Sequence, residues 1–152
     1  YFKKANLQMA VSRPFAITKR ENEFDVIAFK SILGGIESDK YENVPQRVLD
    51  EIYDSLKPGG TLLFAENLAS SFLHRFMRKY FVKWGGRWNY LKYKDIEGLF
   101  TKFSSIEYIT IGFFGAFGRT EGQRNFLGKV DTFFKPIIPK RYRYIVVGIA
   151  KK

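Results

Sequence analysis

The chain has 152 residues, which is enough for one domain with its own hydrophobic core. It has no cysteine and a single histidine, His74, so disulfides, cysteine nucleophiles and metal sites of several histidines are excluded. The 26 Lys and Arg residues outnumber the 15 Asp and Glu residues, and the net charge of +11 favours anionic partners such as phosphates, nucleic acid or a membrane surface.

The first half of the chain predicts the order strand, strand, helix, strand. Residues 7–11 are a short apolar run, and residues 24–29 are nearly continuous in apolar character, as in a strand covered on both faces. Apolar residues then recur at helical spacing over residues 44–56, and residues 61–67 form the next buried strand. Because parallel neighbours need a crossover connection, this order favours a parallel α/β sheet.

The second half predicts two helices, a strand, a further helix and a final strand. These cover residues 70–83, 94–101, 105–114, 121–135 and 142–150, in that order. The last two strands are expected to pair antiparallel, and residues 117–141 form an insertion before the last strand. The helix at residues 121–135 has apolar residues on one face, at positions 126, 127, 130, 133 and 134, and is expected to cover the sheet edge. Docking on a membrane or on a lipid-linked substrate is the alternative for this helix. Neither a repeat nor a low-complexity linker divides the chain, so we predict one domain over residues 1–152.

Two segments carry a resemblance to a known family. The strand Phe24-Asp25-Val26-Ile27 has the pattern F-D-x-I/V, and the turn Leu56-Lys57-Pro58-Gly59-Gly60 has the pattern L-x-P-G-G. With the crossover helix between them and the final strand pair, this order resembles the class I S-adenosylmethionine (SAM)-dependent methyltransferases. The resemblance covers nearly the whole chain. It implies an α/β fold with a Rossmann-like, mostly parallel sheet, helices on both faces and a C-terminal antiparallel β-hairpin.

In the register of that family, the chain begins near the family's third strand. The N-terminal strands are then missing, and so is the glycine-rich cofactor loop, because no G-x-G-x-G occurs in the sequence. We therefore interpret the chain as a single partial methyltransferase-like domain. A second copy in a homo-oligomer is one candidate for supplying the missing part of the sheet.

The resemblance also implies SAM as the cofactor, with binding residues after the first two predicted strands. Ser12 and Arg13 follow the first strand, and Phe29, Lys30 and Ser31 follow the second. Arg13 departs from the family pattern, in which an Asp commonly faces the adenine amine, because a guanidinium has only hydrogen-bond donors. The alternative interpretation makes Phe29 a core residue and Lys30 a solvated charge.

Candidate catalytic and acceptor-binding groups follow the strand at residues 61–67. Ligands of open α/β sheets bind beyond the carboxyl ends of the strands, so we predict Glu66 as a general base and Asn67 as an acceptor-binding residue. Alternatively, Asn67 caps the next helix and Glu66 interacts with the dipole of that helix. His74, on that helix, is a second candidate base, with packing as its alternative role.

The segment of residues 68–94 is basic and aromatic, with seven Lys or Arg residues and no acidic residue. Trp84, Arg87 and Trp88 surround a glycine pair and are predicted to bind the acceptor in a loop. The alternatives are contacts to phosphates and bases, an amphipathic helix on an anionic membrane, or a helix whose aromatic side faces the core.

Together these features predict a cytoplasmic enzyme that, in the complete protein, transfers methyl groups from SAM to a small-molecule, glycan or lipid-linked acceptor. Displacement at the sulfonium carbon depends mainly on proximity and orientation, so few catalytic residues are required. The alternative is a non-enzymatic remnant that binds an anionic partner, nucleic acid or a membrane surface, through the basic aromatic segment. Peripheral membrane contact is a further expectation, and nucleic acid is the less favoured partner.

Overall fold

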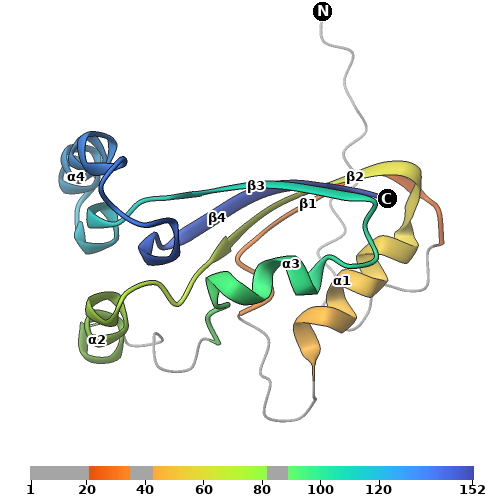
Figure 1. Ribbon diagram of the computed structural model, residues 1–152, viewed down its shortest axis with the longest axis horizontal. Helices are drawn as coiled ribbons and strands as arrows, with labels where there is room; N and C mark the ends of the chain where they lie inside the picture. The colour runs from red at the N-terminus through yellow and green to blue at the C-terminus, as the bar shows by residue number, and fades with distance from the viewer. Residues whose placement is uncertain (1–20, 35–42, 82–88) are drawn as a thin grey trace, which may run out of the picture.

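The computed structural model describes residues 21–34, 43–81 and 89–152, so the strand predicted at residues 7–11 lies outside the described residues. Figure 1 shows the arrangement of the elements. In chain order they are β1 (Phe24–Lys30), α1 (Val44–Ser55), β2 (Leu56–Asn67), α2 (Phe72–Phe81), the 3-10 turn η2 (Tyr93–Asp95), α3 (Ile96–Leu99), β3 (Ser105–Ile111), the 3-10 turn η3 (Phe114–Phe117), α4 (Glu121–Phe134), the 3-10 turn η4 (Lys140–Tyr142) and β4 (Ile145–Lys151).

The four described strands form one mixed sheet in the order β1-β2-β4-β3. β1 and β2 are parallel, whereas β4 is antiparallel to both β2 and β3. The register between β3 and β4 runs from Ser105 opposite Lys151 to Ile111 opposite Ile145, which confirms the predicted antiparallel pair. The last strand in sequence therefore lies inside the sheet. Among the described strands, β1 and β2 form the only parallel pair.

The two motif segments meet at the start of this sheet. Lys57 Nζ lies 2.9 Å from a carboxylate oxygen of Asp25, so the L-x-P-G-G segment is tied to the F-D-x-V strand. Gly59 has φ of +75°, and a Cβ on Gly60 would lie 2.8 Å from the carbonyl oxygen of Lys57. Both glycines are therefore required by the backbone. β2 already begins at Leu56, so the prediction of a separate turn before a strand at residue 61 was wrong.

The core lies between the sheet and the helices α1 and α3. The apolar side of α1 supplies Leu49 and Ile52 to the core, and β2 contributes alternate residues such as Phe64. The Phe64 ring stacks on Phe100, with 4.6 Å between ring centroids. Pro45 stands in the first turn of α1, where its missing N–H is tolerated. The helix predicted at residues 94–101 is shorter than expected, because η2 precedes a four-residue α3.

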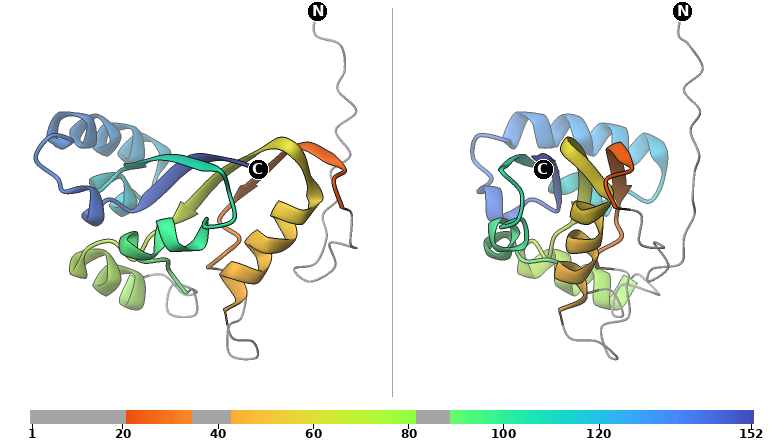
Figure 2. Two further views of the ribbon diagram at one scale, coloured as in Figure 1. Left: turned by 45° about the vertical axis from the view of Figure 1, so that its right-hand side comes forward. Right: turned by 90° about the vertical axis from the view of Figure 1, so that its right-hand side faces the viewer.

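The opposite face of the sheet is open along its middle. Apolar side chains of all four strands are exposed there, among them Val26, Leu63, Ile109 and Ile149. In Figures 1 and 2, α1, α2 and α3 lie on one side of the sheet, and α4 lies on the other side but beyond the end of β3 and β4. Among the described helices, none covers the middle of this face.

Helix α4 matches its predicted bounds within one residue but packs differently from the prediction. Its start is fixed by a capping box, in which the Thr120 side chain accepts from the Gln123 N–H and the Gln123 side chain accepts from the Thr120 N–H. The apolar residues at positions 126, 127, 130, 133 and 134 were expected to share one face. No residue of α4 is buried, and Phe126 and Phe133 point to solvent.

Candidate functional site

The carboxyl ends of β1 and β2 meet at one edge of the sheet and bring Ser31 and Asn67 together. Ser31 follows β1 with φ of +54°, and its N–H donates to the carbonyl oxygen of Ala65 at 2.8 Å. The Asn67 side-chain amide donates to Ser31 Oγ at 2.9 Å. The predicted capping role of Asn67 is wrong, because its amide is used in this contact and α2 begins only at Phe72.

Glu66 ends the buried side of β2 and is only 1% exposed. Its two carboxylate oxygens accept the backbone N–H groups of Leu33, at 2.8 Å, and Asn67, at 3.0 Å. Within the described residues, no ion pair to this carboxylate is found. Burial raises the pKa of Glu66, against a lowering effect of the backbone N–H groups. The side chain thereby holds the loop after β1 against β2, and its role as a general base stays a prediction.

His74 lies on the buried side of α2 and joins this helix to the segment after β3. Its Nε2 lies 2.8 Å from the carbonyl oxygen of Phe113 and must donate, so Nδ1 accepts from Ser71 Oγ at 2.8 Å. The imidazole also stacks on the ring of Phe117, with 4.8 Å between centroids. Burial lowers the pKa of His74, which favours the neutral ring. This geometry supports the packing alternative, and a catalytic role is a prediction that no contact tests.

Arg78 follows His74 by one helical turn and folds the basic aromatic segment back onto the end of β2. Its guanidinium donates to the carbonyl oxygen of Leu68 at 2.7 Å and lies 4.0 Å from the centre of the Tyr90 ring. Burial lowers the pKa of Arg78. Arg78 was not singled out from the sequence, where it is one cation among seven.

Several predicted site residues lie outside the described part of the chain. They are the cofactor candidates Ser12 and Arg13 and the acceptor candidates Trp84, Arg87 and Trp88.

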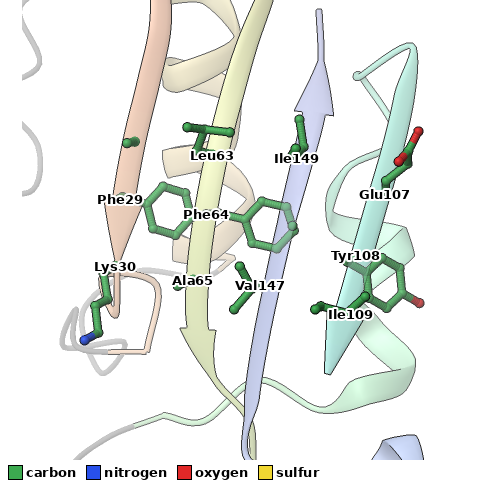
Figure 3. Close-up of a pocket in the computed structure, with 12 residues that line it drawn as sticks. Phe29, Lys30, Leu63, Phe64, Ala65, Glu107, Tyr108, Ile109, Val147 and Ile149 are labelled. Atoms are coloured by element: carbon green, nitrogen blue, oxygen red, sulfur yellow. The ribbon is translucent and has the colours of Figure 1, made fainter. Parts of the chain in front are cut away.

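Phe29 and Lys30, the remaining cofactor candidates, point to opposite faces of the sheet. The ring of Phe29 is buried and stacks on Phe64 at a centroid distance of 6.2 Å, as the core alternative predicted. Lys30 is exposed at the carboxyl end of β1 (Figure 3). Of the two, only Lys30 is therefore open to a ligand.

The open face of the sheet contains a hollow of about 840 Å³ (Figure 3). All four described strands line it, mostly with apolar side chains such as Leu63, Val147 and Ile149. Its volume falls in the range of ligand pockets, about 300–1,000 Å³. Nevertheless, its walls are mainly the exposed apolar side chains of an open sheet face, and a surface of this kind usually marks an interface with other polypeptide.

Asp131 on α4 is an organising residue that the sequence analysis missed. Its Oδ1 accepts the N–H groups of Phe113, at 2.9 Å, and Phe114, at 2.7 Å, while Oδ2 accepts that of Gly115 at 3.0 Å. One carboxylate thus satisfies three backbone donors and ties α4 to η3. A signal was present, since Asp131 is the only acidic residue from Gly122 to the end of the chain.

The described residues do not by themselves fit SAM, the cofactor that the resemblance implies. The Glu66 carboxylate and the Asn67 amide are already engaged in internal hydrogen bonds. The glycine-rich loop that would contact the cofactor is not in the sequence. A metal site is not indicated either, because no cluster of three or more potential ligands occurs among the described residues.

The fold is similar to that of solved methyltransferases. A SAM-dependent methyltransferase from Thermotoga maritima aligns with a TM-score of 0.62 at 19% identity, over 93% of this chain and 62% of its own. Phosphoethanolamine N-methyltransferase 2 from Haemonchus contortus, in complex with phosphomonomethylethanolamine and S-adenosylhomocysteine, gives 0.53 at 16% identity, over 88% of this chain and 34% of its own. The [4+2]-cyclase SpnF gives 0.53 at 14% identity, over 93% and 54%.

No protein-family model matches the sequence, and a search of curated proteins found no match. The chain spans 62% of the Thermotoga protein and a smaller share of the other two. The alignment with the Thermotoga protein covers 93% of this chain, so it includes nearly all of its sheet and helices. The chain thus has the fold of class I SAM-dependent methyltransferases over the part of those proteins with which it aligns.

Proposed function

We propose that the protein containing this chain transfers a methyl group from SAM to a small-molecule, glycan or lipid-linked acceptor. The observation that carries the proposal is the similarity of the fold to methyltransferases solved in complex with S-adenosylhomocysteine or SAM, with TM-scores of 0.53 and 0.52. The fold by itself does not determine the chemistry, since a cyclase is also among its structural neighbours.

Cofactor binding is expected to need polypeptide beyond the described residues. The open apolar face of the sheet and the edge formed by β1 support this part of the proposal, because exposed apolar surface of this extent favours a covering layer. Further residues of the same protein or a second copy of the chain would provide that layer. Sedimentation velocity of the 152-residue chain separates the two, since only the second predicts a dimer.

The role of this chain in the proposed reaction is to position the loops beside the cofactor and acceptor. The cofactor, when bound, supplies a methyl group activated by the sulfonium. Ser31 and Asn67 hold the two strand ends together at the edge where ligands of such sheets bind. Glu66 fixes the backbone of the adjoining loop through the Leu33 N–H.

Calorimetric titration of S-adenosylhomocysteine tests the proposal. The titration is made into the 152-residue chain and into a form that carries additional residues ahead of Tyr1. We expect binding to the longer form only, weakened by Asn67→Ala and unchanged by Asn125→Ala, a control on the exposed side of α4. Binding to neither form would contradict a methyltransferase, and binding to both would contradict the requirement for the missing loop.

The second candidate function is a non-enzymatic module that binds an anionic partner. The observation in its favour is the row of exposed rings on α2, namely Phe72, Phe76 and Tyr80, beside the exposed Arg75 and Lys79. Oligonucleotide binding whose affinity falls steeply with salt would support this function. No binding at low salt would leave methyl transfer as the better proposal.

A further inference from the structure

Helix α4 presents a row of apolar side chains to solvent. Phe126 is 65% exposed, Phe133 is 76% exposed, and Ile137, just beyond the helix, is 73% exposed. Phe126 and Phe133 are seven residues apart, which is about two helical turns and places them on the same side of α4. Ile137 follows four residues later and continues the row. We call Phe126, Phe133 and Ile137 the α4 stripe.

The opposite side of α4 is fixed to the rest of the protein. Asp131 accepts three backbone N–H groups from the segment after β3. Just beyond the C-terminus of α4, one terminal nitrogen of Arg143 donates to the carbonyl oxygens of Lys135, at 2.7 Å, and Ile138, at 3.0 Å. Because the C-terminal part of α4 is held in this way and its N-terminus is fixed by the capping box, the helix displays the α4 stripe on a defined surface.

Cations surround the α4 stripe, and the two nearby acids are engaged elsewhere or stand at the helix start. Residues 119–143 contain seven Lys or Arg and two acidic residues. Lys129 lies between the two phenylalanines in sequence, and Lys140 follows the stripe; both are exposed. Asp131 is turned toward η3, and Glu121 is the first residue of α4. The surface is therefore apolar along its centre and positive along its border.

We propose that the α4 stripe docks on the surface of an anionic lipid bilayer. An apolar row bordered by lysines matches the boundary between acyl chains and negatively charged headgroups, where phenylalanine rings lose contact with water and the lysines meet lipid phosphates. None of the helices in the described ranges has the length and apolar character needed to cross a membrane. The contact is therefore one in which α4 lies along the membrane surface, and it holds whether or not the protein is an enzyme.

Helix α2 offers a matched comparison within the same chain. Phe72 is 74% exposed, nearly as much as Phe133, and it lies on a helix that is also rich in cations. The two helices are on opposite sides of the sheet (Figures 1 and 2). A substitution at Phe72 therefore separates binding through the α4 stripe from a general stickiness of exposed rings.

Vesicle co-sedimentation tests the proposal with the purified chain and two lipid compositions, phosphatidylcholine alone and phosphatidylcholine with phosphatidylglycerol. We expect binding to the anionic vesicles and little to the neutral ones. Phe126→Ser with Phe133→Ser lowers the affinity at least about tenfold, because two rings no longer leave water. Phe72→Ser leaves the affinity unchanged. Circular dichroism and thermal midpoints show that each variant is folded.

Charge reversals provide the second set of variants. Lys129→Glu with Lys140→Glu should lower the affinity for anionic vesicles by at least about fivefold per residue. One lysine near an anionic membrane surface raises the binding affinity by about that factor. Lys92→Glu with Lys94→Glu carries the same change in net charge and should have a smaller effect. The proposal would be overturned if the two double charge reversals lowered the vesicle affinity equally, or if Phe72→Ser lowered it as much as the α4 variant does. Equal binding to both vesicle types, or binding to an oligonucleotide but not to vesicles, would also overturn it.

Discussion

Replacing Glu66 with Gln tests whether the buried carboxylate holds the loop after β1. Each carboxylate oxygen accepts one backbone N–H, from Leu33 at 2.8 Å and from Asn67 at 3.0 Å. Glutamine keeps one acceptor but turns an NH₂ group toward the other N–H, which is then buried without a partner. We therefore expect Glu66→Gln to lower the free energy of unfolding by about 1–3 kcal/mol at neutral pH.

The same variant should change how stability depends on pH. Because burial raises the pKa of Glu66 above its ordinary value of 4.5, the folded protein retains this proton to a higher pH than the unfolded chain does. The stability linked to that proton is present below 4.5 and is lost as the pH rises through the raised pKa of the folded state. Across this window, wild type should lose stability relative to Glu66→Gln with a slope of up to about 1.4 kcal/mol per pH unit.

Urea unfolding followed by circular dichroism, at a series of pH values from acidic to neutral, measures both effects. Glu107→Gln is the control, because it removes an exposed carboxylate from β3 and should change the free energy of unfolding by less than about 0.5 kcal/mol. Suppose instead that Glu66→Gln and wild type have the same free energy of unfolding at neutral pH, and that the difference between them does not change with pH. The carboxylate would then neither hold the loop nor titrate as argued, and a solvated general base would be the better interpretation.

Burial lowers the pKa of His74 below its ordinary value of 6.5. Wild type should therefore lose stability relative to His74→Gln as the pH falls from 6.5 through the lowered pKa. Stability profiles of the two proteins that stay parallel over this pH range would contradict the prediction. Asp131→Asn turns an NH₂ group toward one of three backbone donors and should cost about 1–3 kcal/mol, with faster hydrogen exchange of those amides. Unchanged exchange would refute that role. Gly148→Ala places a Cβ against the ring of Phe64 and should destabilise by about 1–3 kcal/mol, whereas Gly128→Ala has open space and should stabilise α4 by about 0.5–1 kcal/mol. Similar thermal midpoints for these two variants would contradict the packing.

Much of the fold could be predicted because the hydrophobic pattern along the chain is strong. The helical spacing of residues 44–56 and the apolar runs on either side predicted the β1-α1-β2 crossover, and α1 ends within one residue of its expected bound. The start of β2 was missed because Pro58 and the glycine pair are typical of a turn. In the structure, the parallel pairing with β1 extends back to Leu56, opposite Phe24, past an irregularity in the register.

Periodicity predicts that a helix has an apolar side but not what that side contacts. For α4 the spacing is compatible with packing on the sheet edge, yet Phe126 and Phe133 face solvent, because the helix is held through Asp131 and Arg143 on its other side. Those contacts join a side chain to backbone groups, which every residue carries. The isolated acid at Asp131 is visible in the sequence, but its partners cannot be identified from residue types.

In the candidate site, too, the sequence indicated where a residue lies in the fold but not which group it contacts. Position after a strand singled out Ser31, Glu66 and Asn67, and the structure places Ser31 and Asn67 in contact at one edge of the sheet, because the carboxyl ends of β1 and β2 meet there. Their roles in binding and catalysis stay predictions. Their partners were not foreseen: Asn67 contacts Ser31 instead of a helix end, and Glu66 accepts from the Leu33 N–H. For His74, the alternative that proved consistent with the geometry was packing between α2 and the segment after β3.

The position of β4 has a consequence for how this protein is made. β3 joins the rest of the described sheet only through β4, which is the last strand of the chain and pairs with β2 from the middle of it. During synthesis, β1, α1 and β2 can associate early, but β3 has no neighbour until the seven residues of β4 have left the ribosome. Sheet closure is thus a late, long-range event, and pairings of this kind fold slowly. Until then the edges of β2 and β3 are open to pairing with other chains.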